Sequence, residues 1–266
     1  MTKQAIGIFD SGIGGLTILR ALREMLPHEN LIYFGDTANV PYGGKSKEAV
    51  TRLALTVARF LQSQQVKLIV VACNTASAQA LGTLHKKIQV PVMGVIEPGA
   101  DCAVASTRNH KIAVLGTQGT IASNAYVKAI SKRNPQIHIF QQACPLFAPL
   151  VEEDFAQKPA THLIAQEYLE PVKKSQADTV ILGCTHYPIL KELIAQIMGP
   201  NITLVDSADT LALAVKQFLA KHQLAATRGK GTLKLYASDD PQKFSRSAQK
   251  LLHEKLPRTI LKKLSV

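Results

Sequence analysis

Two strand-like runs that each occur twice constrain the fold of this chain more than any other feature of its sequence. Residues 6–11 (Ile-Gly-Ile-Phe-Asp-Ser) resemble residues 112–117, at an offset of 106 positions. Residues 68–74 resemble residues 179–185, at an offset of 111 positions that aligns a cysteine in each run. Generic strands can resemble one another by chance, but here both runs recur in the same order. The pattern therefore indicates a duplicated unit and predicts two pseudo-symmetric domains.

Short β-branched segments alternate with segments of helical period along the whole chain. The first half predicts strands over 5–9, 31–34, 68–72 and around 92–93, and helices over 16–26, from about 46 and from 75. Strands that are buried on both faces, with helices between them, are typical of mostly parallel sheets. The sequence therefore predicts an α/β fold of two domains with mostly parallel sheets, and an active site in the crevice between them.

The last part of the chain exceeds what the second unit of the repeat requires. Residues 232–237 alternate like a strand, and residues 259–264 are a candidate for another. We expect this segment to pack back on the first unit. The predicted division is residues 1–96 plus 207–266 for the first domain and residues 97–206 for the second.

Composition predicts a soluble cytoplasmic protein. The chain has 266 residues, of which 46% are hydrophobic, which is ample for a stable core. No apolar run reaches the length of a membrane span, about 18 residues, and the N-terminus lacks the apolar stretch of a secretory signal. Four cysteines are too few for a disulfide scaffold, and a reducing cytoplasm keeps them as thiols. We interpret Cys102 and Cys144 as structural.

The net charge of +12 raises the possibility of nucleic-acid binding, but its distribution weakens that interpretation. Residues 221–266 contain 11 Lys and Arg against 3 Asp and Glu, so this segment carries +8 of the total. It has no zinc-finger, RNP-type or basic-zipper pattern. A solvated basic face is the simpler interpretation, and such a field can also attract a small anionic substrate.

Polar residues follow four predicted strands, and each group precedes a segment of helical period. These groups are residues 10–15, 73–75, 117–120 and 184–186. Ligands of open α/β sheets bind beyond the carboxyl ends of the strands, and the N–H groups at a helix start attract anions. Such a place suits a carboxylate and lowers the pKa of a thiol toward neutrality. The nearby glycines complete neither a dinucleotide-binding nor a Walker A pattern, so nucleotide chemistry is not expected.

Cys73 and Cys184 end equivalent runs of the repeat, so two facing domains would bring their thiols to the crevice from opposite sides. One such cysteine is more often packing than catalyst, whereas an equivalent pair favours a function. His186 would point to the same side as Cys184 if the strand continued, and could orient or ionise that thiol as a general base. Zinc held by these three residues is a competing hypothesis, which lacks a C-x-x-C pair and an obvious fourth ligand. Asp10, directly after an apolar strand, is either functional or a helix cap.

At these positions the chain resembles the glutamate racemases, and the resemblance covers essentially its whole length. The motifs that carry it are Phe-Asp-Ser-Gly-Ile-Gly-Gly at 9–15, Pro-Tyr-Gly at 41–43, Ala-Cys-Asn-Thr-Ala-Ser at 72–77 and Leu-Gly-Cys-Thr-His-Tyr-Pro at 182–188. The resemblance implies two α/β domains, no cofactor and no metal. It also implies two cysteines on either side of the substrate α-carbon and a role in supplying D-glutamate to peptidoglycan synthesis.

The resemblance also implies individual roles. Cys73 would serve the D-enantiomer with help from Asp10, and Cys184 the L-enantiomer with help from His186. The substrate would be held by Asp10, Ser11, Tyr42, Gly43, Asn74, Thr75, Thr117, Thr120, Thr185 and His186. Glu152 has two open interpretations, support for His186 or part of a solvated acidic loop. Proton transfer works best when the pKa of the transferring group lies near ambient pH, and hydrogen bonds must stabilise the carbanion that forms.

Other functions stay open on the sequence alone. A racemase of the same superfamily could act on aspartate or a hydantoin with the same pair of thiols. A basic nucleic-acid-binding protein, although not favoured, and a zinc hydrolase are the hypotheses from other classes. The expected partner is the small molecule glutamate, with no membrane contact, and assembly as a homodimer is one possibility.

Overall fold

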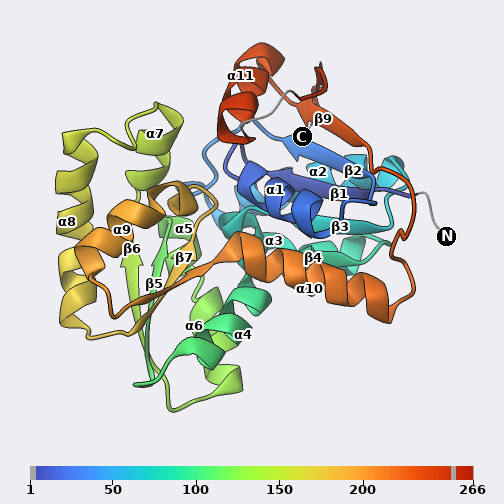
Figure 1. Ribbon diagram of the computed structural model, residues 1–266. Coiled ribbons are helices and arrows are strands. Elements are labelled where there is room, and N and C mark those ends of the chain that lie inside the picture. The colour runs from blue at the N-terminus through green and yellow to red at the C-terminus, as the bar shows by residue number, and fades with distance from the viewer. Residues whose placement is uncertain (1–3, 253–255, 266) are drawn as a thin grey trace.

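The structure, a computed structural model, describes residues 4–252 and 256–265 and contains two parallel β-sheets (Figure 1). The first sheet has six strands in the order β10-β9-β2-β1-β3-β4. These strands are β1 (Ile6–Asp10), β2 (Leu31–Gly35), β3 (Leu68–Val71), β4 (Val92–Gly94), β9 (Leu233–Ala237) and β10 (Thr259–Leu261). Each strand pairs in parallel with its neighbours, as the buried apolar runs predict.

The second sheet has four parallel strands in the order β6-β5-β7-β8. They are β5 (Lys111–Gly116), β6 (His138–Ala143), β7 (Thr179–Gly183) and β8 (Thr203–Asp206). This order repeats β2-β1-β3-β4 of the first sheet strand for strand, with β5 in the place of β1 and β7 in the place of β3. The duplicated α/β unit inferred from the sequence is therefore present, and the two cysteines follow the equivalent strands β3 and β7.

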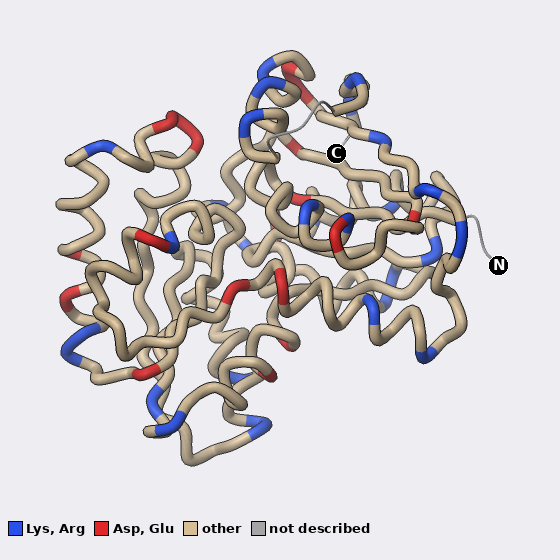
Figure 2. The backbone as a smooth tube through the Cα atoms, viewed as in Figure 1, with Lys and Arg blue, Asp and Glu red and all other residues tan. Residues whose placement is uncertain are grey.

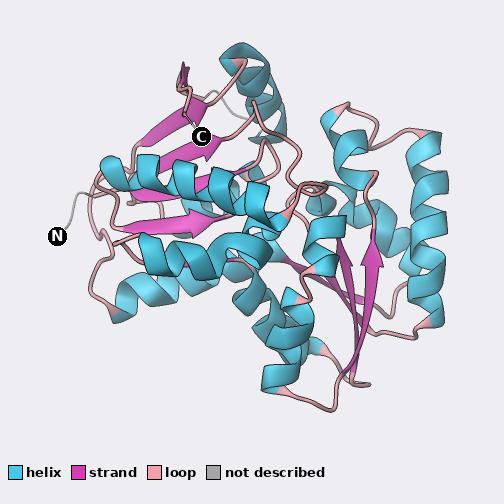
Figure 3. Cartoon of the chain, turned by 180° about the vertical axis from the view of Figure 1, so that it is seen from behind, coloured by secondary structure: helices cyan, strands magenta, loops and turns pink. Residues whose placement is uncertain are grey.

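Helices cover both faces of each sheet (Figures 1 and 3). The first half has α1 (Leu16–Met25), α2 (Lys47–Ser63), α3 (Asn74–Lys87) and α4 (Ile96–Ser106). The second half has α5 (Gln118–Ala122), α6 (Ala125–Arg133), α7 (Phe147–Glu152), α8 (Pro159–Lys174), the 3₁₀ helix η1 (Tyr187–Leu190) and α9 (Lys191–Met198). The helices α10 (Ser207–Lys221) and α11 (Pro241–Leu252) follow. Among the described residues, no helix is both long and apolar enough to span a membrane.

One hydrophobic core is shared between the two sheets. Alternate strand residues point to opposite faces, so Ile8 packs toward α1 and α10 whereas Phe9 packs toward α2 and α3. The cluster that contains Ile8 continues through Leu211 of α10 to Val114 of β5. Full burial of one such aliphatic side chain stabilises the fold by about 1.5–3 kcal/mol. The two sheets are thus held together by a continuous apolar layer that passes through α4, α6 and α10.

The C-terminal segment extends the first sheet, as expected from its strand-like runs. The strand β9 pairs with β2, and β10 pairs with β9. The second of these strands ends at Leu261 rather than at the predicted residue 264. The N–H of the next residue, Lys262, donates to the carbonyl oxygen of Ala237 at 2.9 Å, and Ala237 is the last residue of β9. The partner strand therefore sets the length of β10.

Candidate active site

The carboxyl ends of the two sheets meet at a cavity of about 180 Å³. The loops around it are joined by hydrogen bonds between the sheets. The Gly119 N–H donates to the Gly43 carbonyl oxygen at 2.8 Å, and the hydroxyls of Thr75 and Thr117 are 2.9 Å apart. The cavity is lined by Ser11, Pro41, Tyr42, Gly43, Gly44, Cys73, Asn74, Thr75, Thr117, Gln118, Pro145, Ala148, Pro149, Cys184, Thr185 and His186.

Cys73 is the N-cap residue of α3, so its thiol lies where the backbone leaves β3 and the helix begins. Its Sγ is 4.0 Å from the Ser11 hydroxyl. The sequence predicted a lowered thiol pKa at this helix start, and that prediction is wrong for Cys73. Burial raises its pKa, and the nearby Asp10 carboxylate raises it further. The hydrogen bond from the Ala76 N–H and the contact with Ser11 lower it by less, so Cys73 is a neutral thiol here.

Cys184 has a different neighbour, the imidazole of His186. Its Sγ lies 3.7 Å from His186 Nδ1, and His186 Nε2 lies 3.0 Å from a carboxylate oxygen of Glu152. The predicted contact between thiol and imidazole is present, but the reason given for it was wrong. The strand ends at Gly183, and His186 has helical dihedral angles, so a turn and not a continued strand brings the ring to the sulfur.

The environment of His186 favours its charged form. Burial by itself lowers the pKa of the imidazole, but hydrogen bonds to Cys184 and Glu152, together with their charges, raise it to about 10. At neutral pH both ring nitrogens therefore carry protons. One N–H is then directed to Glu152 and the other to the sulfur of Cys184, an arrangement that stabilises a thiolate.

Asp10 lies behind the cavity wall and is fully buried. One carboxylate oxygen accepts the Gly12 N–H at 3.0 Å, and the other accepts the Thr185 hydroxyl at 3.4 Å. Burial raises the pKa of Asp10, whereas the charge of His186 lowers it. The loop after Asp10 approaches the opposite sheet so closely that a Cβ on Gly14 would lie 2.4 Å from the Thr185 hydroxyl oxygen. A glycine at position 14 is therefore required for the two halves of the site to meet.

Hydroxyl groups form the opposite part of the wall. Thr117 caps α5 by accepting the Thr120 N–H at 3.2 Å, and its hydroxyl also donates to the Thr120 hydroxyl oxygen at 3.0 Å. Thr120 thus supports Thr117 and Thr75 from behind the cavity. The Tyr42 hydroxyl donates to Asp36 at 2.6 Å, and burial and that carboxylate raise the pKa of Tyr42. These side chains surround the cavity with neutral hydrogen-bonding groups.

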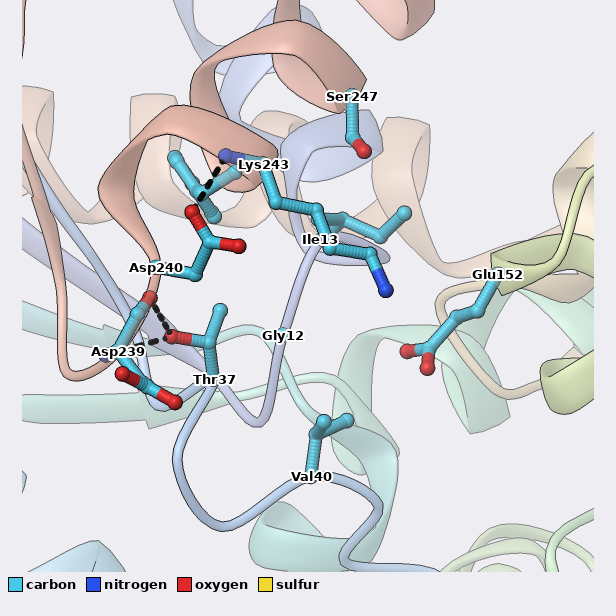
Figure 4. A pocket seen from close by; sticks show the side chains of 10 residues that line it. Gly12, Ile13, Thr37, Val40, Glu152, Asp239, Asp240, Lys243 and Ser247 are labelled. Atoms are coloured by element: carbon cyan, nitrogen blue, oxygen red, sulfur yellow. Dashed lines mark hydrogen bonds between the residues drawn. The ribbon is translucent and has the colours of Figure 1, made fainter.

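Glu152 lines a second cavity of about 300 Å³ (Figure 4), and its carboxylate contacts His186, which lines the first one. In that view its carboxylate faces the space between the loop after β1 and the helix α11, and the Lys243 side chain extends from α11 into the same space. Of the two interpretations of Glu152, the structure supports the contact with His186. The carboxylate is a partly buried partner of the imidazole and not part of a fully solvated loop, since only 24% of its side chain is exposed.

The sequence did not single out several residues at the site. Pro145, Ala148 and Pro149 line the cavity from the segment after β6. Because the polar motifs recognised in the sequence all follow strand ends, the end of β6 could have marked this segment as part of the site. Asp36, Tyr126 and Ser207 contact site residues from distant parts of the chain, and no local pattern marks them.

The described part of the chain has no group of three or more His, Cys, Asp or Glu side chains placed to hold a metal ion. The set proposed for zinc consisted of Cys73, Cys184 and His186. In the structure these residues line one cavity, with His186 directed to Cys184 and Glu152.

Residues 16–215 match the Asp/Glu/Hydantoin racemase family. This match spans most of the chain and includes both cysteines, and the chain belongs to this family.

Several proteins that are similar to this chain over nearly its whole length are glutamate racemases. The glutamate racemase of Geobacter metallireducens is 49% identical over 257 residues, which cover 96% of this chain and 95% of that protein. The crystal structure of a glutamate racemase from Bacillus anthracis has a TM-score of 0.95 at 34% identity, covering 98% of this chain and 97% of that one. The glutamate racemase of Francisella tularensis, crystallised with D-glutamate, has a TM-score of 0.92 at 37% identity and covers 98% of both chains.

Proposed function

We propose that this protein interconverts L- and D-glutamate by proton transfer between two cysteines, without a cofactor or metal. The observation that carries the proposal is the pairing of unlike thiols at one cavity. Cys73 is a buried neutral thiol, whereas Cys184 lies beside a protonated His186 that stabilises a thiolate. One sulfur is therefore ready to donate a proton and the other to accept one, which is what inversion at a single carbon requires.

In the L-to-D direction, the Cys184 thiolate removes the α-proton of L-glutamate and becomes a thiol. The Cys73 thiol gives its proton to the opposite face of the same carbon and becomes a thiolate. One proton leaves the substrate and one enters it, so the product is D-glutamate and the pair of thiols has exchanged charge states. D-glutamate reacts by the reverse steps. Asp10 assists Cys73, and His186, supported by Glu152, assists Cys184.

The negative charge that develops on the substrate needs hydrogen-bond donors. Asn74, Thr75 and Thr185 line the cavity beside the thiols, and the start of α3 adds backbone N–H groups. We assign the remaining roles in holding the substrate to Asp10, Ser11, Tyr42, Gly43, Thr117, Thr120 and His186. Asp10 and Thr120 lie behind the wall of the cavity, so they act through the groups that they support.

The wider setting belongs to the same proposal. The protein acts in the cytoplasm and supplies D-glutamate for peptidoglycan synthesis, as the glutamate racemase family implies. We also propose the two-domain division at residues 1–96 plus 207–266 and 97–206, which the presence of two separate sheets supports. We include assembly as a homodimer, for which the exposed apolar side chains of Leu146 and Phe155 offer a surface. Sedimentation at micromolar concentration tests the assembly.

The test of the reaction is racemisation of L-glutamate in deuterated water, followed by circular dichroism and mass spectrometry. Because donor and acceptor are different groups, deuterium should appear mainly in the product, with no added metal or pyridoxal phosphate. Early and heavy labelling of unreacted L-glutamate would indicate a single base instead. L-aspartate in a parallel reaction separates glutamate racemisation from the same reaction on a shorter substrate.

A further inference from the structure

Asn74 carries an unusual polar atom. The residue is 2% exposed and lines the active-site cavity, yet its side-chain oxygen Oδ1 is buried without a hydrogen-bond partner among the described residues. A buried acceptor that stays unpaired costs about 1–3 kcal/mol, so such atoms in native proteins usually have a function. The oxygen of Asn74 is available to a ligand in the cavity.

The other end of the Asn74 amide is fully engaged. Its Nδ2 donates to the Tyr126 hydroxyl oxygen at 2.9 Å and to the Ser207 hydroxyl oxygen at 3.4 Å. The Ser207 hydroxyl donates to the Leu182 carbonyl oxygen at 3.1 Å. Because the Ser207 hydroxyl gives its proton to Leu182, it can only accept from Asn74.

These directions leave one orientation for the amide. The Tyr126 oxygen accepts one Nδ2 proton and the Ser207 oxygen accepts the other. Since the proton of Ser207 goes to Leu182, Ser207 presents only a lone pair to Asn74. If the amide were turned over, its oxygen would face that lone pair, and this arrangement is repulsive. The NH₂ group is therefore held toward Tyr126 and Ser207, which leaves Oδ1 as the atom for a ligand.

The chemistry of the ligand follows from that atom. Oδ1 accepts hydrogen bonds and cannot donate them. Glutamate at neutral pH has two carboxylates, which are acceptors only, and one donor group, the α-ammonium. The ammonium is bonded to the carbon that loses and gains the proton, so its placement sets the position of that carbon between the thiols.

The hydrogen bonds of Asn74, Tyr126, Ser207 and Leu182 also connect the two sheets close to the two cysteines. Asn74 directly follows Cys73, and Leu182 lies two residues before Cys184. Tyr126 is held in place by close packing, since a Cβ on Gly99 or on Gly183 would lie 3.3 or 3.2 Å from its ring. The same hydroxyls thus connect the ends of β3 and β7.

We propose that Tyr126 and Ser207 are positioning residues, which hold the Asn74 amide with its oxygen toward the substrate ammonium. This inference rests on the proposed function. Neither residue touches the reacting carbon, so their effect passes through Asn74.

The test compares glutamate with glutarate, which has both carboxylates but no ammonium group. In Tyr126→Phe the ring packing is kept and the acceptor for Nδ2 is lost. We expect KM for L- and D-glutamate to rise about tenfold with a smaller change in kcat, while the inhibition constant of glutarate changes by less than about twofold. Ser207→Ala should change the same constants in the same direction, and Ser207→Thr should restore them. A parallel rise of KM and of the glutarate constant, or an unchanged KM, would overturn the inference.

Matched variants separate positioning from general damage. Tyr236→Phe and Ser106→Ala remove hydroxyls away from the cavity, and both should leave KM and the glutarate constant unchanged. In an Asn74→Ala background, Tyr126→Phe should add no further effect, and an independent additional loss would contradict action through Asn74.

Failure of the proposed function has a different outcome. If the wild-type protein does not racemise glutamate, calorimetric binding of D-glutamate and glutarate to wild type and Tyr126→Phe still tests the amide orientation. A selective loss of D-glutamate binding supports the orientation without the reaction. Equal binding by both proteins, or no binding of either ligand to wild type, overturns it.

Discussion

Cys73 and Cys184 occupy equivalent places in the repeat but differ in their immediate neighbours. Cys73 has the Ser11 hydroxyl and the buried Asp10 carboxylate nearby, and its pKa is raised by burial first and by that charge second. Cys184 has the imidazole of His186 at 3.7 Å. The two otherwise similar sulfur atoms therefore differ in having a carboxylate near one and an imidazole beside the other.

Replacement of either sulfur should stop the reaction. Cys73→Ser and Cys184→Ser should each lower kcat for both enantiomers by at least about 100-fold, because a hydroxyl at that position is a poor acid and base. The far-ultraviolet circular dichroism spectrum should remain that of the wild type. Cys102→Ser serves as the control and should keep wild-type rates. A rate close to wild type in either site variant would remove that thiol from the mechanism.

The pair of Glu152 and His186 should set the high-pH limit of the L-to-D reaction. The pKa of His186 is raised to about 10, so the imidazole is charged below that pH and loses its charge as pH rises through it. Glu152→Gln removes one cause of the raised pKa. We expect the fall of kcat at high pH to begin at least about one pH unit lower than in the wild type. Glu153→Gln, an exposed neighbour, should leave the pH profile unchanged, and an unshifted limb in Glu152→Gln would contradict the assignment.

At the scale of elements, the linker between α10 and β9 is held by a buried ion pair. Lys67 Nζ lies 2.6 Å from Glu29 Oε2 and also donates to the Leu224 carbonyl oxygen, while the Ala226 N–H donates to Glu29 Oε1. Both side chains are 1% exposed. The pair therefore fastens the linker to the ends of the first sheet, and β9 enters beside β2 from that point.

Removal of one charge from this pair should destabilise the protein strongly. In Lys67→Met the Glu29 carboxylate would stay buried without its partner, and we expect the free energy of unfolding to fall by about 3–5 kcal/mol. Urea denaturation at neutral pH measures the change. Lys234→Met, which removes an exposed lysine from β9, should change stability by less than about 0.5 kcal/mol. A comparable loss in the two variants would show that the ion pair is not the cause.

For the whole molecule, residues 221–266 carry +8 of the net charge of +12, but the basic side chains themselves are not confined to this segment. Lys and Arg occur around both sheets, with Asp and Glu among them (Figure 2). Within the C-terminal segment, Lys250 pairs with Asp154 and Lys262 lies over the Phe60 ring. The ion pairing of some basic side chains, and the scatter of the others around both sheets, weaken the positive field that a nucleic-acid backbone would meet.

Binding to DNA should therefore be weak. With a short duplex at about 0.15 M salt, fluorescence anisotropy should give a Kd no tighter than about 10 µM, the range of non-specific contacts. Glutamate racemisation measured in the same buffer is the control for folded protein. Submicromolar binding with a steep salt dependence would restore the nucleic-acid hypothesis.

Local sequence is enough to predict much of this protein. The α/β alternation, the duplicated strand order and the placement of both cysteines at strand ends follow from periodicity and from the repeat, and the structure has all three. The N-cap position of Cys73 was likewise predictable within one residue. These features depend on residues close together in the chain, and their patterns can be recognised without contacts.

Other features depend on packing between distant residues. The raised pKa of Cys73 results from burial, which a helix start alone does not reveal. The turn at His186 replaced the continued strand, and Ser207 meets Asn74 across 133 positions of sequence. A periodic pattern records which face of an element is buried. It does not record which distant side chain will face it, and at this site those pairings set the neighbours of each sulfur and the partners of each hydrogen-bonding group.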